Sequence, residues 1–363
     1  MIVWIIAGLL GMATGLRIGW ALVNRQSVVS GAMIVALGSL AVVAALNWPP
    51  LTLLVDTGLG WPNISVGLSQ VALVMSAAGS CVMITSVAAT RATATMRRLA
   101  AIQYGVAAVI ATVTMVLFLD DGREPEMAPK EYLAHNVGLP GEVVDWLVPL
   151  LYVLVALTVV AWVGARLSSA TRRGRALLLF TAGMALIVAA SAFFLTRALR
   201  RSQLVGVGTV LTLLLCAMAV VAIGALLPAV EDWIGARREL RLIEPLRREM
   251  ARRHPDIGIG TRPRGPLVFR VAERLSLISD ALYLEGALAQ RGSGPGVDGH
   301  GVPADVDVAE QAGAVARWIR AGRDEVSTAF PGRRWLRQPA DCSDREWILE
   351  IARQYRVRAD PPS

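Results

Sequence analysis

The sequence is poor in cysteine, histidine and lysine. It has three cysteines, three histidines and a single lysine, Lys130, against 35 arginines. Cys81 and Cys216 lie in apolar stretches and Cys342 lies near the carboxyl end, so no two cysteines share a CxxC spacing. This pattern argues against a disulfide framework and against a zinc motif. We therefore expect neither a metal site nor a cofactor.

Charge is nearly absent from the long apolar stretches. Seven runs have about the length that crosses a bilayer as a helix, and they contain Arg17 but no Asp, Glu, Lys or His. The sequence therefore predicts an all-α polytopic membrane protein, with a seven-helix transmembrane domain over 1–228 and a small cytosolic helical domain after it. The runs cover residues 2–22, 28–47, 64–86, 99–119, 146–165, 177–196 and 204–228.

The loops between the runs indicate the orientation, because Lys and Arg stay on the cytoplasmic side of a membrane. The loop 48–63 has no basic residue and the loop 120–145 is acidic. We therefore expect the N-terminus outside a plasma membrane and the C-terminal domain in the cytoplasm. The loop 197–203 carries three arginines, although seven spans with an outside N-terminus place this loop outside. We keep seven spans, because the apolar runs are a stronger signal than the charges of one short loop. The loops expected inside are 23–27, 87–98 and 166–176, and each contains arginine.

The net charge of +8 invites a nucleic-acid interpretation, but the distribution of charge argues against one. Residues 229–363 carry 22 arginines and 20 acidic residues, a net charge of only +2. No aromatic residues are interleaved with these arginines as a stacking platform. The excess positive charge lies beside the runs, where it reports topology. As partners we expect the lipid bilayer and a cytosolic protein, and no nucleic acid.

A basic amphipathic helix is predicted soon after the seventh run. Seven arginines between 237 and 253 alternate with apolar residues at helical spacing. Two interpretations stay open: contact with an anionic leaflet, or a solvated face on which Glu239, Glu244 and Glu249 pair with arginines locally. The candidate leaflet-contact residues are Arg237, Arg238, Arg241, Arg247 and Arg248.

Few polar side chains interrupt the apolar runs. Gln70 lies near the outer end of the third run, and Gln103 and Tyr104 lie near the inner end of the fourth. Such groups hydrogen-bond between helices or line a substrate cavity, so these three are the candidate cavity residues. Ion-coupled transporters usually need a titratable group or a broken helix near the membrane midplane, and the runs show neither.

The residues after the runs predict further helices. A juxtamembrane basic helix and a second helix occupy 229–290, a glycine-rich linker 291–304, and a C-terminal helical segment 305–358. Ser343 and Glu346 have the spacing of a capping box, and Asp307 marks the start of another helix. The glycine-rich linker follows a helix instead of a strand, which does not fit a phosphate-binding loop.

Two stretches after the runs carry a resemblance: "ARRELRLIEPLRREMARRHPDI" and "FRVAERLSLISDALYLEGAL". With the seven runs, they resemble an actinobacterial family of membrane proteins labelled as transporters, which have seven spans and a C-terminal helical domain of unknown function. The family's leucine and proline pattern falls on Leu240, Pro245 and Leu246 here, whereas its second arginine pair is missing from "RVAERLSLISD". The resemblance implies the architecture and leaves the mechanism open.

No catalytic motif is found in the sequence, and we expect the protein not to be an enzyme. Asp120, Asp121 and His135 offer groups for a lipid-modifying enzyme, but paired aspartates at the end of a span are typical of a solvated boundary. The leading hypothesis is a sensor or scaffold that couples the membrane domain to a cytosolic protein. The alternative is a transporter or exporter of a small neutral or apolar substrate, with a regulatory cytosolic tail.

Overall fold

The computed structural model describes residues 2–23, 27–88, 93–120, 124–136, 143–169, 171–200, 206–256, 267–292, 306–321 and 332–357. The secondary structure of these residues is helical, without strands, which confirms the predicted all-α class. The chain divides into two compact units, Met1–Pro228 and Ala229–Ser363. Asp121, residues 201–203 and nearly all of the predicted linker 291–304 lie outside the described residues.

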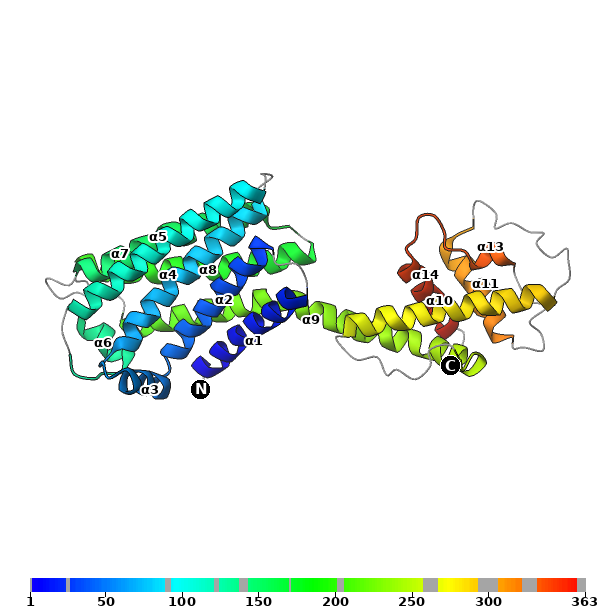
Figure 1. Cartoon of the computed structure of the whole chain (residues 1–363), viewed down its shortest axis with the longest axis horizontal. Helices are drawn as coiled ribbons and strands as arrows, with labels where there is room; N and C mark the ends of the chain where they lie inside the picture. Colours follow the sequence, from blue (N-terminus) through cyan, green and yellow to red (C-terminus); the bar gives the residue numbers. More distant parts are fainter. Residues whose placement is uncertain are drawn as a thin grey trace. The chain divides into compact units, whose positions relative to one another are not determined.

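Among the described residues, seven helices are long and apolar enough to cross a bilayer. The chain is therefore an integral, multi-pass membrane protein (Figure 1). The helices correspond to the seven predicted runs. They are α1 (Ile2–Val23), α2 (Val28–Leu46), α4 (Ile64–Ala88), α5 (Thr93–Asp120), α7 (Val143–Leu167), α8 (Arg172–Arg200) and the first part of α9 (Val207–Arg253).

Small residues bring the helices of the first unit close together. A Cβ atom on Gly79 of α4 would lie 2.7 Å from the backbone nitrogen of Ala36 in α2. A Cβ atom on Gly183 of α8 would lie 2.9 Å from the backbone nitrogen of Val221 in α9. In lipid, close van der Waals contact between backbones replaces the hydrophobic effect as the source of helix association. These glycines therefore allow α4 to lie close to α2 and α8 to lie close to α9.

One end of the bundle carries two short helices where only loops were predicted. They are α3 (Pro49–Leu59) and α6 (Pro129–Asn136), which lie at the same end in Figure 1. Asp56 of α3 is buried and accepts hydrogen bonds from the backbone nitrogen and the hydroxyl of Ser65, at 2.8 and 3.1 Å. The backbone N–H groups in the first turn of α4 have no partner within their own helix, and the Asp56 carboxylate accepts a hydrogen bond from one of them.

Asn63 joins the two loops at this end. Its backbone has a φ of 60°, and its side chain donates to the carbonyl of Pro125 and accepts from the backbone nitrogen of Met127, both at 2.9 Å. Asn tolerates this left-handed conformation better than most residues. The segment before α6 is thereby fixed to the turn before α4, so the two loops form one structured cap.

The second unit is a small helical domain with its own apolar core. Its helices are the last part of α9, α10 (Leu267–Gly292), α11 (Val308–Arg320), α13 (Arg333–Leu336) and α14 (Asp344–Val357). The predicted capping box is confirmed: Glu346 donates its backbone N–H to the Ser343 hydroxyl at 3.3 Å, and Ser343 donates to the Glu346 carboxylate at 3.0 Å. The core contains Ile243, Leu246, Val271, Ile278, Trp318, Ile319, Trp347 and Ile351.

Two local features differ from the sequence-based expectation. The seventh run was predicted to end at residue 228, but α9 continues through Pro228 and Pro245 to Arg253. Each proline removes one backbone hydrogen bond. The residues around the prolines include Ala, Glu, Leu and Arg, which favour the helical conformation, so the helix continues past both prolines. Asp307 is the N-cap residue of α11, as expected, yet its side chain makes no capping hydrogen bond.

Candidate functional sites

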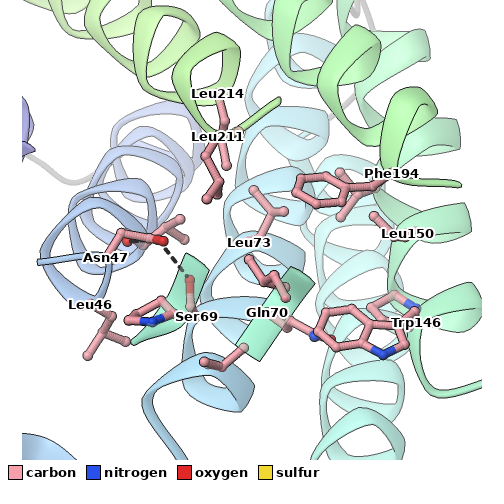
Figure 2. A pocket seen from close by; sticks show the side chains of 16 residues that line it. Leu46, Asn47, Ser69, Gln70, Leu73, Trp146, Leu150, Phe194, Leu211 and Leu214 are labelled. Carbon is pink, nitrogen blue, oxygen red and sulfur yellow. Dashed lines mark hydrogen bonds between the residues drawn. The ribbon is translucent and has the colours of Figure 1, made fainter. Parts of the chain in front are cut away.

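An apolar pocket lies at the end of the bundle that α3 and α6 cap. Its volume is about 90 Å³, and side chains from α2, α4, α6, α7, α8 and α9 line it. Figure 2 shows these side chains converging from helices that are far apart in the sequence. The apolar lining includes Leu46, Leu73, Leu150, Phe194, Leu211 and Leu214.

Three polar side chains reach this pocket. Asn47 follows α2 and donates to the carbonyl of Val43 at 2.8 Å and to the hydroxyl of Ser69 at 3.5 Å (Figure 2). Ser69 and Gln70 enter from α4. No charged residue is among those that line the pocket. An apolar cavity with a few amides and hydroxyls is the usual composition of a small-molecule site, in which the polar groups orient the ligand.

Trp146 forms part of the pocket wall. A tryptophan at the end of a membrane span is typical of an aromatic belt at the membrane surface, but Trp146 is only 9% exposed. The reason is α6: Tyr132 of that helix forms a buried cluster with Trp146 and Val66. Helix α6 therefore covers the beginning of α7 and contributes Pro129 and Leu133 to the wall of the pocket.

The other two candidate cavity residues do not line this pocket. Gln103 of α5 donates to the hydroxyl of Tyr152 in α7 at 3.0 Å, which is a hydrogen bond between helices. Tyr104 packs against the apolar core of the bundle. Of the three residues singled out in the sequence, Gln70 lines this pocket, and Gln103 has the interhelical role that was the other interpretation.

The candidate leaflet-contact arginines fall into two groups. Arg237, Arg238 and Arg241 are exposed, and Arg237 lies over the ring of Trp233 with its guanidinium carbon 5.1 Å from the ring centre. Arg247 and Arg248 both pair with Glu244 at 2.9 Å. The local-pairing interpretation thus describes the second group, whereas the first keeps its guanidinium groups at the surface.

Glu244 connects α9 to α10. The hydrogen bond from Arg247, assisted by a second one from Arg248, lowers the pKa of Glu244 from 4.5 to about 2, against the effect of partial burial. Arg274 of α10 lies 3.1 Å from the second carboxylate oxygen. A carboxylate that accepts several charge-assisted hydrogen bonds strongly favours its ionised form, so Glu244 holds three arginines of two helices in place.

A buried glutamate forms a second link that the sequence reasoning missed. Glu285 of α10 is 2% exposed, and its Oε1 lies 3.2 Å from Nε2 of His254 and 3.7 Å from a guanidinium nitrogen of Arg253. The signal was present in α10, because position 285 follows Val271, Leu275, Ile278 and Leu282 at the same helical spacing and therefore falls on the buried face.

A groove of about 590 Å³ crosses the surface of the second unit between α10, α13 and α14. Leu282, Trp347 and Ile348 are buried and form its floor. Tyr283, which is 66% exposed, stands at its edge. This groove was not predicted, although Tyr283 lies off the apolar face of α10 as a large exposed side chain. The polar edge consists of Ser279, Arg334, Arg337, Gln338 and Asp344.

Comparison with known proteins adds no relative, since no family model, no curated protein and no solved structure matches this chain. The resemblance to the actinobacterial seven-span family therefore stays a prediction. Within the described residues, no group of three or more His, Cys, Asp and Glu side chains is placed to hold a metal ion.

Proposed function

We propose that this integral membrane protein is a sensor that acts by binding and not by catalysis. In this proposal the pocket between α2, α4, α7, α8 and α9 receives an apolar or amphipathic ligand on the outer side of a plasma membrane. The second unit lies in the cytoplasm and binds a protein partner through the groove between α10, α13 and α14. The leading hypothesis from the sequence, a sensor or scaffold, thereby becomes specific: the pocket receives the ligand and the groove binds the partner.

The observation that supports this function best is the composition of the groove. The floor of the groove belongs to the apolar core of the second unit, whereas Tyr283, Arg334 and Arg337 at its edge are exposed and are not part of that core. An exposed tyrosine, two exposed arginines and a floor with Trp347 resemble the centre of protein–protein interfaces, where Tyr, Trp and Arg are enriched. A partner that presents acidic and apolar side chains would complement Arg334, Arg337 and Tyr283.

The exposed arginines at the start of the second unit support the cytoplasmic placement. Arg237, Arg238 and Arg241 follow the last apolar turns of α9 closely and have no carboxylate partner among the described residues. Basic groups beside a span are retained on the cytoplasmic side, where anionic lipids attract them with about 1 kcal/mol each. Leaflet contact in this proposal therefore rests on these three residues and not on Arg247 and Arg248.

The test is capture of partners from native membranes with full-length protein. Wild type is compared with a double variant of the groove, Tyr283→Ala with Arg337→Glu, and with Arg317→Glu as the control. Arg317 is exposed on α11 and does not line the groove. We expect one soluble protein to be recovered with wild type and control but reduced at least about tenfold with the groove variant, as for loss of interface anchors.

Equal recovery from the groove variant would contradict the proposed output surface. The competing function, transport or export of a small neutral or apolar substrate, has one observation in its favour: Gln70 lines a pocket at one end of the bundle. That function predicts substrate flux in proteoliposomes of the purified chain. Flux that is abolished by Leu211→Trp, with no groove-dependent partner, would decide for transport.

A further inference from the structure

The only lysine of the chain lies beside the apolar pocket. A second cavity, of about 120 Å³, shares Asn47, Pro129, Leu211 and Leu214 with the pocket, and Lys130 of α6 lines it. The two cavities are therefore neighbours on either side of the same four residues. One has an uncharged and mostly apolar lining, and the other adds a primary ammonium group.

The position of Lys130 is defined by α9. A Cβ atom on Gly208 would lie 3.2 Å from Cε and 3.3 Å from Nζ of Lys130, so the side chain runs across the glycine near the beginning of that helix. Lys130 makes no ion pair with any described residue, and neither cavity has Asp or Glu in its lining. The exposed ammonium group of Lys130, with three hydrogen-bond donors, thus lines the second cavity, whose other lining residues provide no counter-charge.

This arrangement selects for a ligand with two unlike ends. An apolar molecule would fill the pocket but leave the ammonium group unused, and a small hydrophilic anion would gain nothing from the leucines and Phe194. A molecule with an anionic head and an apolar chain satisfies both, because the head pairs with the ammonium group and the chain leaves water. The two cavities, of about 90 and 120 Å³, have room for the head group and the nearest part of one chain and no room for the second chain of a phospholipid.

We propose that the pocket binds a single-chain anionic amphiphile of the fatty-acid type, with its head group at Lys130. The chain extends between α4, α7 and α8 toward Leu73, Leu150 and Phe194, and Asn47 lies at the junction of the two cavities. The inference rests on the proposed function in taking this pocket as the ligand site, and it adds the chemical class of the ligand and the residue that recognises its charge.

The experiment uses full-length protein purified in a neutral detergent and two photoreactive probes. One is a palmitic acid that carries a diazirine in its chain, and the other is the alcohol with the same chain and diazirine. Cross-linked peptides are identified by mass spectrometry and binding is titrated with unlabelled palmitate. We expect the acid to label peptides that contain Leu73, Phe194 or Leu211, up to about fivefold more efficiently than the alcohol, as for one charge pair at an exposed lysine.

Three variants make the test specific. Lys130→Gln should lower the affinity for the acid up to about fivefold, because the lysine is exposed, and leave that for the alcohol unchanged, and Lys130→Arg should retain the preference for the acid. Arg98→Gln removes one positive charge from an exposed position of α5 outside both cavities and should change nothing. Leu211→Trp fills the space shared by the two cavities and should abolish labelling by both probes.

The outcomes separate this inference from the proposed function. One outcome is equal labelling by the acid and the alcohol, which Leu211→Trp abolishes and Lys130→Gln leaves unchanged. This outcome would overturn the anionic head group and leave the pocket as a ligand site. Labelling that none of the variants alters would show that the probes bind elsewhere, and this would overturn the inference together with the pocket as the sensor's input. The partner capture described above does not depend on either result.

Discussion

The two units of this protein are both helical but differ in what brings their helices together. The first unit has an apolar core of its own, but small residues such as Gly79 and Gly183 set its closest helix contacts, and many large apolar side chains remain on its outside. The second unit buries its largest apolar residues, including Trp318 and Trp347, and surrounds them with ion pairs. Exposed large residues of the first unit include Ile102, Val109, Val155 and Trp162.

The difference follows from the solvent that each unit meets. In a bilayer, a large apolar side chain is as well placed against lipid as against another helix, so helices associate where small residues allow close contact. In water, the same side chain gains about 1.5–3 kcal/mol by burial, so it moves inside and charged residues remain at the surface. The predictions below test this contrast in order of expected effect.

Removal of the largest buried side chain of the second unit should have the largest effect. Trp318→Ala removes a residue that is 1% exposed, and such a truncation costs about 3–5 kcal/mol. We expect residues 229–357 to become sensitive to limited proteolysis while fragments of the bundle stay protected. Tyr283→Ala is the control, with an expected change within about 0.5 kcal/mol. Resistance of the Trp318 variant would show that this core does not hold the unit together.

Adding a single carbon to the bundle should have the next largest effect. Gly79→Ala places a Cβ atom 2.7 Å from the backbone of α2, and overpacking of this kind costs about 1–3 kcal/mol. We expect a lower thermal midpoint in size-exclusion chromatography of the detergent-solubilised protein. Gly105→Ala should be neutral, because a Cβ atom there meets nothing within 4 Å. Equal midpoints for both variants would mean that close approach of α2 and α4 is not required.

The smallest effect should come from the ion pairs of the second unit. Glu244 has a pKa lowered from 4.5 to about 2, so its contribution to stability is present above about pH 4.5 and is lost as the pH falls toward 2. Glu244→Gln should lower the free energy of unfolding by about 1 kcal/mol at pH 7, since the pairs are partly exposed. Below pH 2 it should have little effect.

Thermal unfolding at pH 7, 4.5 and 3 measures the effect of Glu244→Gln. The gap between wild type and variant should narrow as the pH decreases. Glu310→Gln, at an exposed position of α11, serves as the control. A gap that widens on acidification would mean that another group of the second unit dominates its response to acid.

Much of the architecture could be predicted because its signals are local. A run of about 20 apolar residues without charge predicts a membrane helix wherever it stands, and all seven were correctly located. The capping box at Ser343 and Glu346 likewise depends on neighbours in sequence. The candidate site was predicted only in part: Gln70 was singled out as a rare polar residue, whereas Leu211, Phe194 and Trp146 look like any other residue of an apolar helix.

The sequence by itself determined that this is an all-α membrane protein with seven spans, because hydropathy and length decide whether a segment leaves water. The tertiary structure decided which helix ends meet. It placed α6 over Trp146, brought Lys130 to the start of α9 and set Glu285 beside His254. These contacts join residues far apart in the sequence, and their free energy depends on packing and burial that no local pattern records.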